Sequence, residues 1–343
     1  MQRQLKYSTL YLLLILMVVF LFLLDISLGT VSIPLADIIS SLTGSSASKN
    51  TWEYIIVNYR LPKAITAILV GSGLSISGLL MQTLFRNPLA GPYVLGLSSG
   101  SSLGVALVIL GAGFLPMMWS DFLVSSFGII VASCLGSSLV LLSILLISQR
   151  LRDTTVILVA GLMFGSFTNA FVSVLTYFST AEQLQKFTFW SLGNLGNLSW
   201  SAILILTIAV LIGLLLSIFS IKNLDTLLLG ENYARSLGMN FKRARLLIIL
   251  ATSILAGSIT AFAGPIAFVG LAVPHMAKLI FQTSNHAVLF WSTLLLGASM
   301  MLLCDVISQV PGGDITLPIN AVTSMIGAPM VVWLLLRKKK MMG

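Results

Sequence analysis

Charged residues are scarce in this chain. Of its 343 residues, 8% are Asp, Glu, Lys or Arg, whereas a water-soluble domain carries about 25%. Hydrophobic residues make up 57% of the sequence, and the mean hydropathy is +1.03. The composition therefore excludes a soluble globular protein and predicts a chain that lies in a membrane.

Acidic residues are missing from the middle of the long apolar runs. All ten Asp and Glu lie in loops or near the ends of these runs, and Asp305 is the deepest of them. Ion-coupled carriers and proton pumps usually keep an ionisable side chain at mid-membrane depth. We therefore expect any energy for transport to come from another source.

That source is not expected in this chain. The sequence has no G-x-x-x-x-G-K-[ST] phosphate-binding loop, no Gly-Lys dipeptide and no H-E-x-x-H zinc motif. Its two histidines, His275 and His286, have no ligand partners at metal-binding spacing, and Cys134 and Cys304 fall inside apolar runs. We expect no metal, no cofactor and no disulfide framework.

Apolar runs long enough to cross a bilayer, about 20 residues each, are plentiful. Ten candidate spans are predicted, and the one at 268–281 is short and contains Pro274. The ten are Thr9–Leu24, Pro62–Leu84, Tyr93–Ala112, Phe122–Ile147, Thr154–Phe178, Ser201–Ile221, Leu246–Ala263, Phe268–Phe281, Val288–Leu303 and Leu317–Leu336. The fold class is therefore all-α and polytopic, and residues 1–343 are predicted to form a single transmembrane domain.

The cations are distributed unevenly between the two sides of the membrane. With the N-terminus inside, alternation across ten spans puts fifteen Lys and Arg in inner loops and leaves only Lys49, Arg60, Lys63 and Lys186 outside. This is the positive-inside bias. It predicts that both termini are cytoplasmic and that the basic end, Arg337–Lys340, anchors the chain at the inner face. The first apolar run lacks a convincing cleavage site and is expected to be retained as a helix.

Two segments interrupt the apolar pattern. The stretch "RNPLAGPYVLGLSSGSSLG", residues 86–104, holds two prolines, four glycines and four serines. Non-helical backbone at this depth survives only beside protein or a water-filled cavity. The second segment, about 222–245, is predicted to form a short amphipathic helix, a break at Gly230, and a second short helix from about Glu231 to Gly238. It is either an inert connection on the membrane surface or a projection that fits a cytoplasmic partner.

Small residues recur at four-residue spacing in two rows. Such rows let helix backbones approach closely in lipid. Helix packing is the preferred interpretation for the row of Gly96, Gly100 and Gly104. The other row ends in polar side chains, which face a partner or a wet cavity at mid-membrane depth. A lining of a transport path is therefore expected for Gly161, Gly165, Asn169 and Ser173.

Several stretches, in order, resemble one family of permeases. The first is "YRLPKAITAILVGSGLSISGLLMQTLFRNPLAGPYVLGLSSGSSLG". The others are "LVAGLMFGSF", "FWSLGNL", "LLLGENYARSLGMN", "AGPIAFVGLAVPHMAKLI" and "LPINAVTSMIGAPMVVWLLL". Together they resemble the FecCD-like permease subunits of type II ABC importers for iron–siderophore, haem and vitamin B12. The resemblance covers residues 8–337.

The resemblance implies an assembly and roles for particular residues. Two permease copies, expected to be identical, would surround the path in the bacterial inner membrane. Two cytoplasmic ATPases and one extracytoplasmic binding protein would complete the importer. The chain itself is then expected not to be an enzyme and to bind no nucleic acid. Asn87, Pro88, Leu89, Thr154 and Thr155 would form the cytoplasmic gate. The residues that would contact the ATPase are Gly230, Glu231, Ala234, Leu237 and Gly238, and those that would dock the binding protein are Arg60 and Lys63.

Two positions depart from the family pattern. Gln309 stands where some members have a further basic residue, and Pro318-Ile319-Asn320 replaces the usual Pro-x-Gly before the last span. The substrate stays open among iron–siderophore, haem and cobalamin. A secondary transporter or channel acting without an ATPase is the main alternative, and an intramembrane enzyme, for which no nucleophile–base pair is found, is the third.

Overall fold

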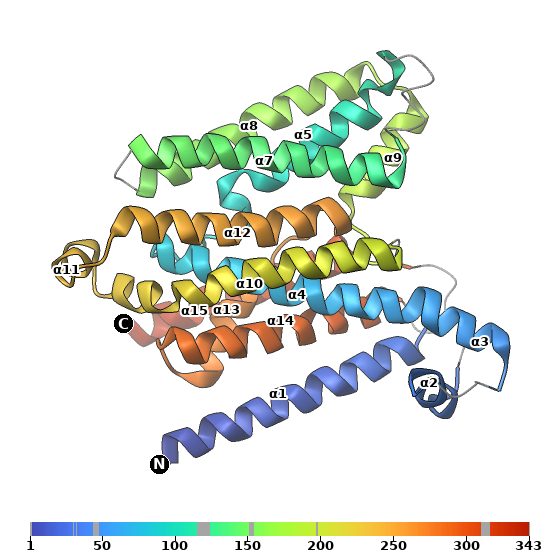
Figure 1. The fold of residues 1–343 in the computed structure, drawn as a ribbon, viewed down its shortest axis with the longest axis horizontal. Helices are drawn as coiled ribbons and strands as arrows, with labels where there is room; N and C mark the ends of the chain where they lie inside the picture. The colour runs from blue at the N-terminus through green and yellow to red at the C-terminus, as the bar shows by residue number, and fades with distance from the viewer. Residues whose placement is uncertain are drawn as a thin grey trace. The chain divides into compact units, whose positions relative to one another are not determined.

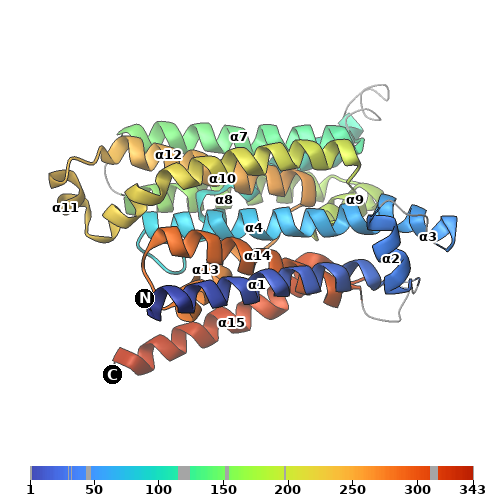
Figure 2. The ribbon, with the colours of Figure 1, turned by 60° about the horizontal axis from the view of Figure 1, so that its bottom comes forward.

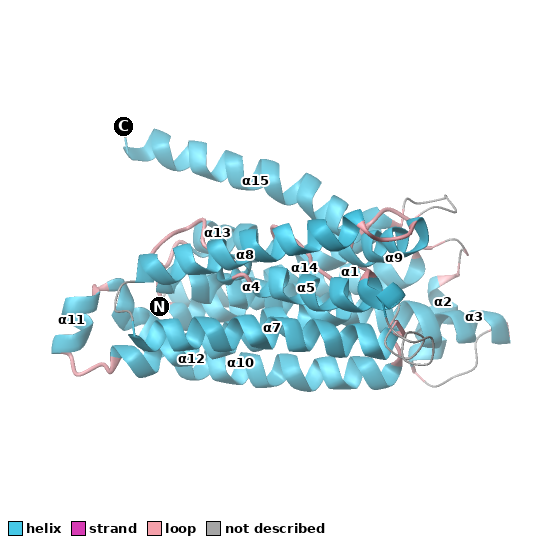
Figure 3. Cartoon of the chain, turned by 90° about the horizontal axis from the view of Figure 1, so that it is seen from above, coloured by secondary structure: helices cyan, strands magenta, loops and turns pink. Residues whose placement is uncertain are grey.

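The computed structural model describes residues 2–29, 31, 33–43, 48–114, 124–150, 154–196, 198–309 and 316–342. Every regular element in these ranges is a helix (Figure 3), so the predicted all-α fold class is confirmed. The helices of the first half are α1 (Gln2–Ser27), α2 (Leu35–Leu42), α3 (Asn50–Ile55), η1 (Ile56–Arg60), α4 (Leu61–Leu84), η2 (Pro92–Leu95), α5 (Leu97–Ile109), η3 (Gly111–Phe114) and α7 (Ser126–Arg150). Those of the second half are α8 (Thr154–Tyr177), α9 (Ala181–Ser191), α10 (Trp200–Leu228), α11 (Glu231–Ser236), α12 (Phe241–Ala263), α13 (Val269–Phe281), α14 (His286–Ser308) and α15 (Ile319–Met342).

The apolar helices match the ten predicted spans. Seven helices in the described part are long and apolar enough to cross a membrane. Three shorter apolar segments, Leu97–Ile109, Val269–Phe281 and Ile319–Trp333, correspond to the remaining predicted spans. The short span at 268–281 is confirmed as α13, and it keeps Pro274 inside the helix.

Contacts within the chain divide it into two compact units, each assembled from separate stretches of sequence. Unit 1 comprises Met1–Ser75, Asn194–Thr207 and Ala267–Gly343, and unit 2 comprises Ile76–Gly193 and Ile208–Ile266. A single transmembrane domain over the whole chain stays a prediction.

Unit 1 is built around α14. Helices α1, α13 and α15 all contact it, and α1 runs alongside it in Figure 1. Both chain ends lie at one end of this unit, whereas α2 and α3 lie at the other (Figures 1 and 2). The cytoplasmic location of both termini stays a prediction.

Unit 2 is built around α5 and α7, with α8 and α12 packed against them. Helix α11 lies at one end of this unit and α9 at the other (Figures 1 and 3). The row of small residues on α5 makes the close packing possible. A Cβ atom added to Gly100 would come within 2.6 Å of the carbonyl oxygen of Gly136 on α7, and one added to Gly104 would overlap the carbonyl oxygen of Ala132. The predicted packing role of this row is thereby confirmed.

A bulky side chain at Gly136 should break this contact. We expect Gly136→Leu to lower the free energy of unfolding by about 1–3 kcal/mol or more, because the added atoms meet the backbone of α5 rather than a flexible side chain. Ser138→Leu is the matched control, since Ser138 lies on the exposed side of the same helix. Thermal unfolding of the purified protein in nanodiscs measures both. Equal melting temperatures for the two variants would contradict the packing role.

Candidate functional site

The predicted gate turn begins where α4 ends. The amide of Asn87 donates a hydrogen bond to the carbonyl of Gln82 (3.1 Å), and the amide of Arg86 donates to that of Thr83 (3.2 Å). This pair of bonds is the Schellman motif, in which the residue after the helix adopts a left-handed conformation and is usually glycine. Here that residue is Arg86, with φ of 47°. A non-glycine residue therefore closes the helix in an unfavourable backbone conformation.

The turn continues through the three predicted gate residues. The side-chain oxygen of Asn87 accepts a hydrogen bond from the amide of Leu89 (2.9 Å), and the amide of Ala90 donates to the carbonyl of Asn87 (3.0 Å). Pro88 has no amide hydrogen and cannot continue a helix here. Ala90 is buried, whereas Leu89 is exposed. The turn is thus held by its own hydrogen bonds and presents one apolar side chain outward.

The second predicted gate element is described only in its backbone. Helix α8 begins at Thr154, so Thr154 and Thr155 form its first turn. The side chains of both threonines lie outside the described part of the chain. Their role in a gate stays a prediction.

The predicted coupling loop differs from expectation at its start. The sequence predicts a separate short helix before Gly230, but α10 continues without a break to Leu228. No Pro or Gly interrupts residues 214–228, and Leu224 and Leu227 are buried, so the apolar face of α10 extends to its end. The second short helix is confirmed as α11. Gly230 precedes it with φ of 110°, a conformation that favours glycine, and Gly238 follows it.

Only part of α11 is exposed. Ala234 is fully buried within this chain, whereas Tyr233 and Leu237 are 57% and 60% exposed. The amide of Ala234 donates to the carbonyl of Gly230 (2.8 Å), and the amide of Met239 donates to that of Ala234 (3.1 Å). The exposed apolar side chains of the loop are therefore Tyr233 on α11, Leu237 just after it, and Leu228 and Leu229 before it. Tyr233 is not among the residues predicted to contact the ATPase, and the predicted contact of Ala234 with the ATPase stays a prediction. The side chain of Glu231 lies outside the described part.

The predicted path-lining row on α8 divides into two parts. A Cβ atom added to Gly96 would come within 2.8 Å of the carbonyl oxygen of Gly161, so Gly161 packs against the start of α5. Gly165 lies close to Ser99, also on α5. Asn169 and Ser173, further along the helix, are exposed. The row rotates around the helix because four residues advance slightly more than one turn, so only its second half faces outward.

Most of the other exposed side chains of α8 are apolar, although Ser166 is exposed as well. Met163, Phe167, Phe171 and Val174 are all exposed there. A cavity of about 410 Å³ on this helix is lined by Ala160, Met163, Phe164 and Phe167. An exposed surface that combines Phe and Met side chains with an amide and a hydroxyl is suited to a partner that is itself partly apolar.

Arg60, predicted to dock a binding protein, has partners within unit 1. It is 9% exposed, and its guanidinium donates hydrogen bonds to the carbonyls of Ile26 (2.8 Å), Ser27 (3.0 Å) and Val31. These carbonyls lie at the end of α1 and just after it, where helix carbonyls lack intrahelical partners. Arg60 therefore holds the end of α1 against η1. Its docking role stays a prediction.

Lys63, the second predicted docking residue, is also paired. Its Nζ lies 3.0 Å from Oδ1 of Asp305, and Asp305 is 1% exposed. Nearby, Nε2 of Gln309 donates to Oδ1 of Asp25 (2.7 Å), and Asp25 is 2% exposed. The departure at Gln309 thus has a structural explanation, because its amide binds a buried carboxylate. We call Asp25, Arg60, Lys63, Asp305 and Gln309 the polar clamp.

The second departure also has a partner. The side-chain oxygen of Asn320, at the start of α15, accepts a hydrogen bond from the amide of Ala267 (3.0 Å). An asparagine at this position fastens the start of α15 to the segment before α13.

A carboxylate on α2 is also held within the chain. In the loop after α2, the side chain and amide of Ser48 both donate hydrogen bonds to Oδ1 of Asp37 (2.5 and 2.7 Å), and these bonds lower the pKa of that carboxyl below its usual value.

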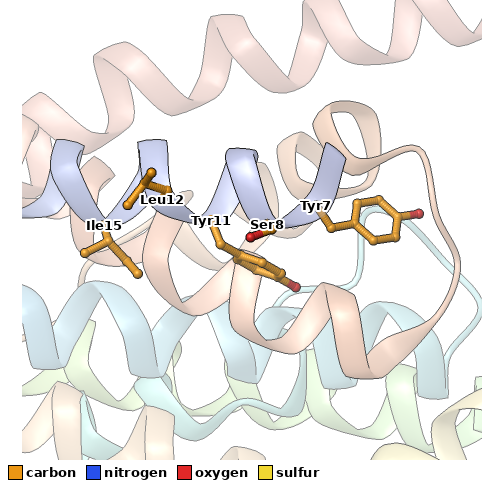
Figure 4. A pocket seen from close by; sticks show the side chains of 5 residues that line it. All are labelled: Tyr7, Ser8, Tyr11, Leu12 and Ile15. Carbon is orange, nitrogen blue, oxygen red and sulfur yellow. The ribbon is translucent and has the colours of Figure 1, made fainter. Parts of the chain in front are cut away.

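A further cavity of about 510 Å³ runs along α1 and is lined by Tyr7, Ser8, Tyr11, Leu12 and Ile15 (Figure 4). The Tyr11 hydroxyl donates to the carbonyl of Val288 (2.9 Å), and the rings of Tyr7 and Tyr11 contact that of Phe281. These contacts fasten α1 to the facing helices of unit 1.

Comparison with solved structures defines the class of protein. Over 96% of this chain and 99% of the other, the structure superposes on an inward-facing structure described as a metal-chelate type ABC transporter, with a TM-score of 0.83 and 28% identity. A similar fold, with a TM-score of 0.56 and 17% identity, occurs in PsaBC from Streptococcus pneumoniae. The chain is therefore a polytopic membrane protein with the fold of a type II ABC importer permease.

The sequence comparisons then identify the family. The sequence model of the FecCD transport family matches residues 15–337, and the chain belongs to this family. It is 34% identical over 301 residues to the hemin transport system permease protein HmuU of Yersinia pestis, covering 88% of each chain. It is 37% identical over 288 residues to the vitamin B12 import system permease protein BtuC of Klebsiella pneumoniae, covering 84% of each.

Removing the guanidinium from the polar clamp should destabilise unit 1. We expect Arg60→Met to lower the free energy of unfolding by about 2 kcal/mol or more, since it leaves the buried Ile26 carbonyl unpaired, and an unsatisfied buried acceptor costs about 1–3 kcal/mol. Lys49→Met, which removes a cation stacked on the ring of Trp52, is the matched control. Thermal unfolding in nanodiscs measures both, and an unchanged melting temperature for Arg60→Met would contradict the role of Arg60.

Proposed function

We propose that the chain is the permease subunit of an ATP-binding-cassette importer that moves an iron chelate (a siderophore complex or haem) or cobalamin into the cytoplasm. The observation that carries the proposal is α11, which exposes Tyr233 and Leu237 beyond the end of a long apolar helix. Large exposed apolar side chains on a short projecting helix mark a site of protein contact. The chain has no phosphate-binding loop of its own, so the partner that contacts this helix is a separate, soluble ATPase subunit.

A second copy of the permease is part of the same proposal. Of the seven long apolar helices in the described part, α8 is the least buried within the chain. Its exposed side chains include Asn169 and Ser173. Polar side chains in a spanning helix avoid lipid, so these two are expected to face something other than lipid. A homodimer whose copies face each other across α8 would place these groups beside a central path. The apolar side chains around them would favour a large, partly apolar cargo.

The remaining partners follow from the charges and from the family. The asymmetric distribution of Lys and Arg fits a chain in the inner membrane with both termini in the cytoplasm. The extracytoplasmic binding protein follows from the membership of the family. Docking of the binding protein at Arg60 and Lys63 would require its carboxylates to compete with the internal partners of these residues. Such docking would make binding sensitive to salt.

Charged substitutions of the exposed apolar side chains at α11 should weaken binding of the ATPase. We expect Leu237→Asp, or Tyr233→Asp, to weaken copurification of the ATPase subunit about 30-fold or more, because a buried apolar contact at an interface is worth about 2 kcal/mol. Gln282→Asp adds the same charge to another exposed loop and is the control. Binding is measured by titrating labelled ATPase onto the permease in nanodiscs. Full binding by both α11 variants would contradict the proposed function.

The proposed cargo predicts a selective response to large chelates. In proteoliposomes that contain the permease, its ATPase and its binding protein, we expect one of three ligands to raise ATP hydrolysis: a ferric hydroxamate siderophore, hemin or cyanocobalamin. Hydrated Fe²⁺, kept reduced with ascorbate and supplied without a chelator, is the control, since the described residues contain no group of His, Cys, Asp or Glu side chains that could hold a bare ion. Stimulation by the control and by none of the three ligands would exclude the proposed cargo class.

A further inference from the structure

Arg86 occupies a backbone position at which glycine is usual. As the left-handed residue that closes the Schellman motif of α4, it has φ of 47°. This conformation costs a residue with a Cβ atom about 1 kcal/mol. The presence of a long cationic side chain at such a position indicates that the side chain itself is used.

The guanidinium of Arg86 connects the gate turn to the end of α10. Its Nη2 donates a hydrogen bond to the carbonyl of Leu227 (2.7 Å). The amide of Gly230 donates to the same carbonyl (3.2 Å). A Cβ atom added to Gly230 would lie 3.6 Å from Nη2 of Arg86. One carbonyl oxygen therefore joins the gate turn, the last turn of α10 and the first residue of the coupling loop.

The path from this carbonyl to each functional element is short. On one side, Arg86 is bonded directly to Asn87, whose side chain holds the amide of Leu89. On the other side, the carbonyl of Gly230 accepts from the amide of Ala234, the buried residue of α11. All of these residues lie in unit 2. If α11 shifts, the Gly230 backbone must move with it or the hydrogen bond from Ala234 to Gly230 must break. Gly230 and Arg86 both donate to the carbonyl of Leu227, so a movement of Gly230 also affects the acceptor of Arg86.

We propose that Arg86 is a positioning residue that transmits movement of the ATPase-binding helix α11 to the gate turn Asn87–Leu89. This inference rests on the proposed function, because it requires an ATPase that moves α11. The charge-assisted hydrogen bond from Arg86 to Leu227 is the link. When the link is absent, the ATPase still binds α11 and hydrolyses ATP, but the gate no longer responds.

The test separates the side chain of Arg86 from its backbone. Arg86→Gly removes the guanidinium and supplies the residue that a left-handed helix cap prefers, so the turn itself is preserved. Arg86→Asn serves as a second variant, since asparagine also tolerates this conformation. Arg86→Lys keeps a cationic donor able to reach a carbonyl. Lys186→Ala removes a different exposed cation, on α9, outside the predicted gate and the predicted coupling loop, and is the matched control.

The readout is the accessibility of the gate. The exposed gate residue carries the substitution Leu89→Cys in a background of Cys134→Ser and Cys304→Ala, and the permease is assembled with its ATPase in proteoliposomes. The rate at which the introduced thiol reacts with N-ethylmaleimide is measured with and without ATP, beside the rate of ATP hydrolysis. We expect the ATP-dependent change in labelling to fall about ten-fold in Arg86→Gly and Arg86→Asn. Arg86→Lys should retain part of the response, and Lys186→Ala should behave as the parent.

Each other outcome counts against a defined statement. A parental labelling response in both Arg86→Gly and Arg86→Asn overturns the inference. A parallel loss of labelling response and ATPase binding also overturns it, since Arg86 would then act on assembly rather than on transmission. A parent complex that binds no ATPase, or hydrolyses ATP without any change in labelling, overturns the proposed function itself, and the inference with it.

Discussion

Hydrogen bonds from arginine to main-chain carbonyls at helix ends are the interaction on which the connections of this protein depend. Arg60 binds the carbonyls at the end of α1, Arg86 binds Leu227 at the end of α10, and Arg245 binds Ser148 near the end of α7. The last carbonyls of a helix have no intrahelical donors and carry the negative end of its dipole. A guanidinium group supplies the missing donors, because it presents several N–H groups, and it is attracted to the negative end of the dipole, because it is always charged.

The composition explains why carbonyls take this role. The chain has 19 Lys and Arg but only ten Asp and Glu, so many of the cations cannot be paired with carboxylates. Two of the side-chain ion pairs between described residues are Lys63–Asp305 and Lys186–Glu182. Helix ends are plentiful in a polytopic fold. Each of these arginines fixes a helix end to another segment, and in unit 2 Arg86 connects the predicted gate turn to the carbonyl of Leu227, three residues before Gly230.

Helix packing supplies the rigid background for these connections. Gly100 and Gly104 of α5 bring it into contact with the backbone of α7, and Gly71 of α4 similarly adjoins Gly297 of α14. In lipid, such approach replaces the hydrophobic driving force that packs soluble helices. Polar groups left exposed on α8, in contrast, have no partner from this kind of packing. The long apolar helices of the described part thus differ in burial: the segment that contains α4 is mostly buried within the chain, whereas α8 is the least buried. The outward side of α8 is the one proposed to face a second copy or the cargo.

The sequence by itself determined the number and the approximate limits of the apolar helices, the break after Leu84 and the one at Gly230, because hydropathy and helix-breaking residues act locally. It also carried the family motifs. Only the tertiary structure showed that Ala234 is buried and Tyr233 exposed, that Gly161 packs while Asn169 does not, and that Arg60, Arg86 and Gln309 have partners within the chain. The physical reason is that a partner 34, 141 or 284 residues away leaves no periodic trace in the sequence, since such contacts depend on how packed helices bring distant ends together.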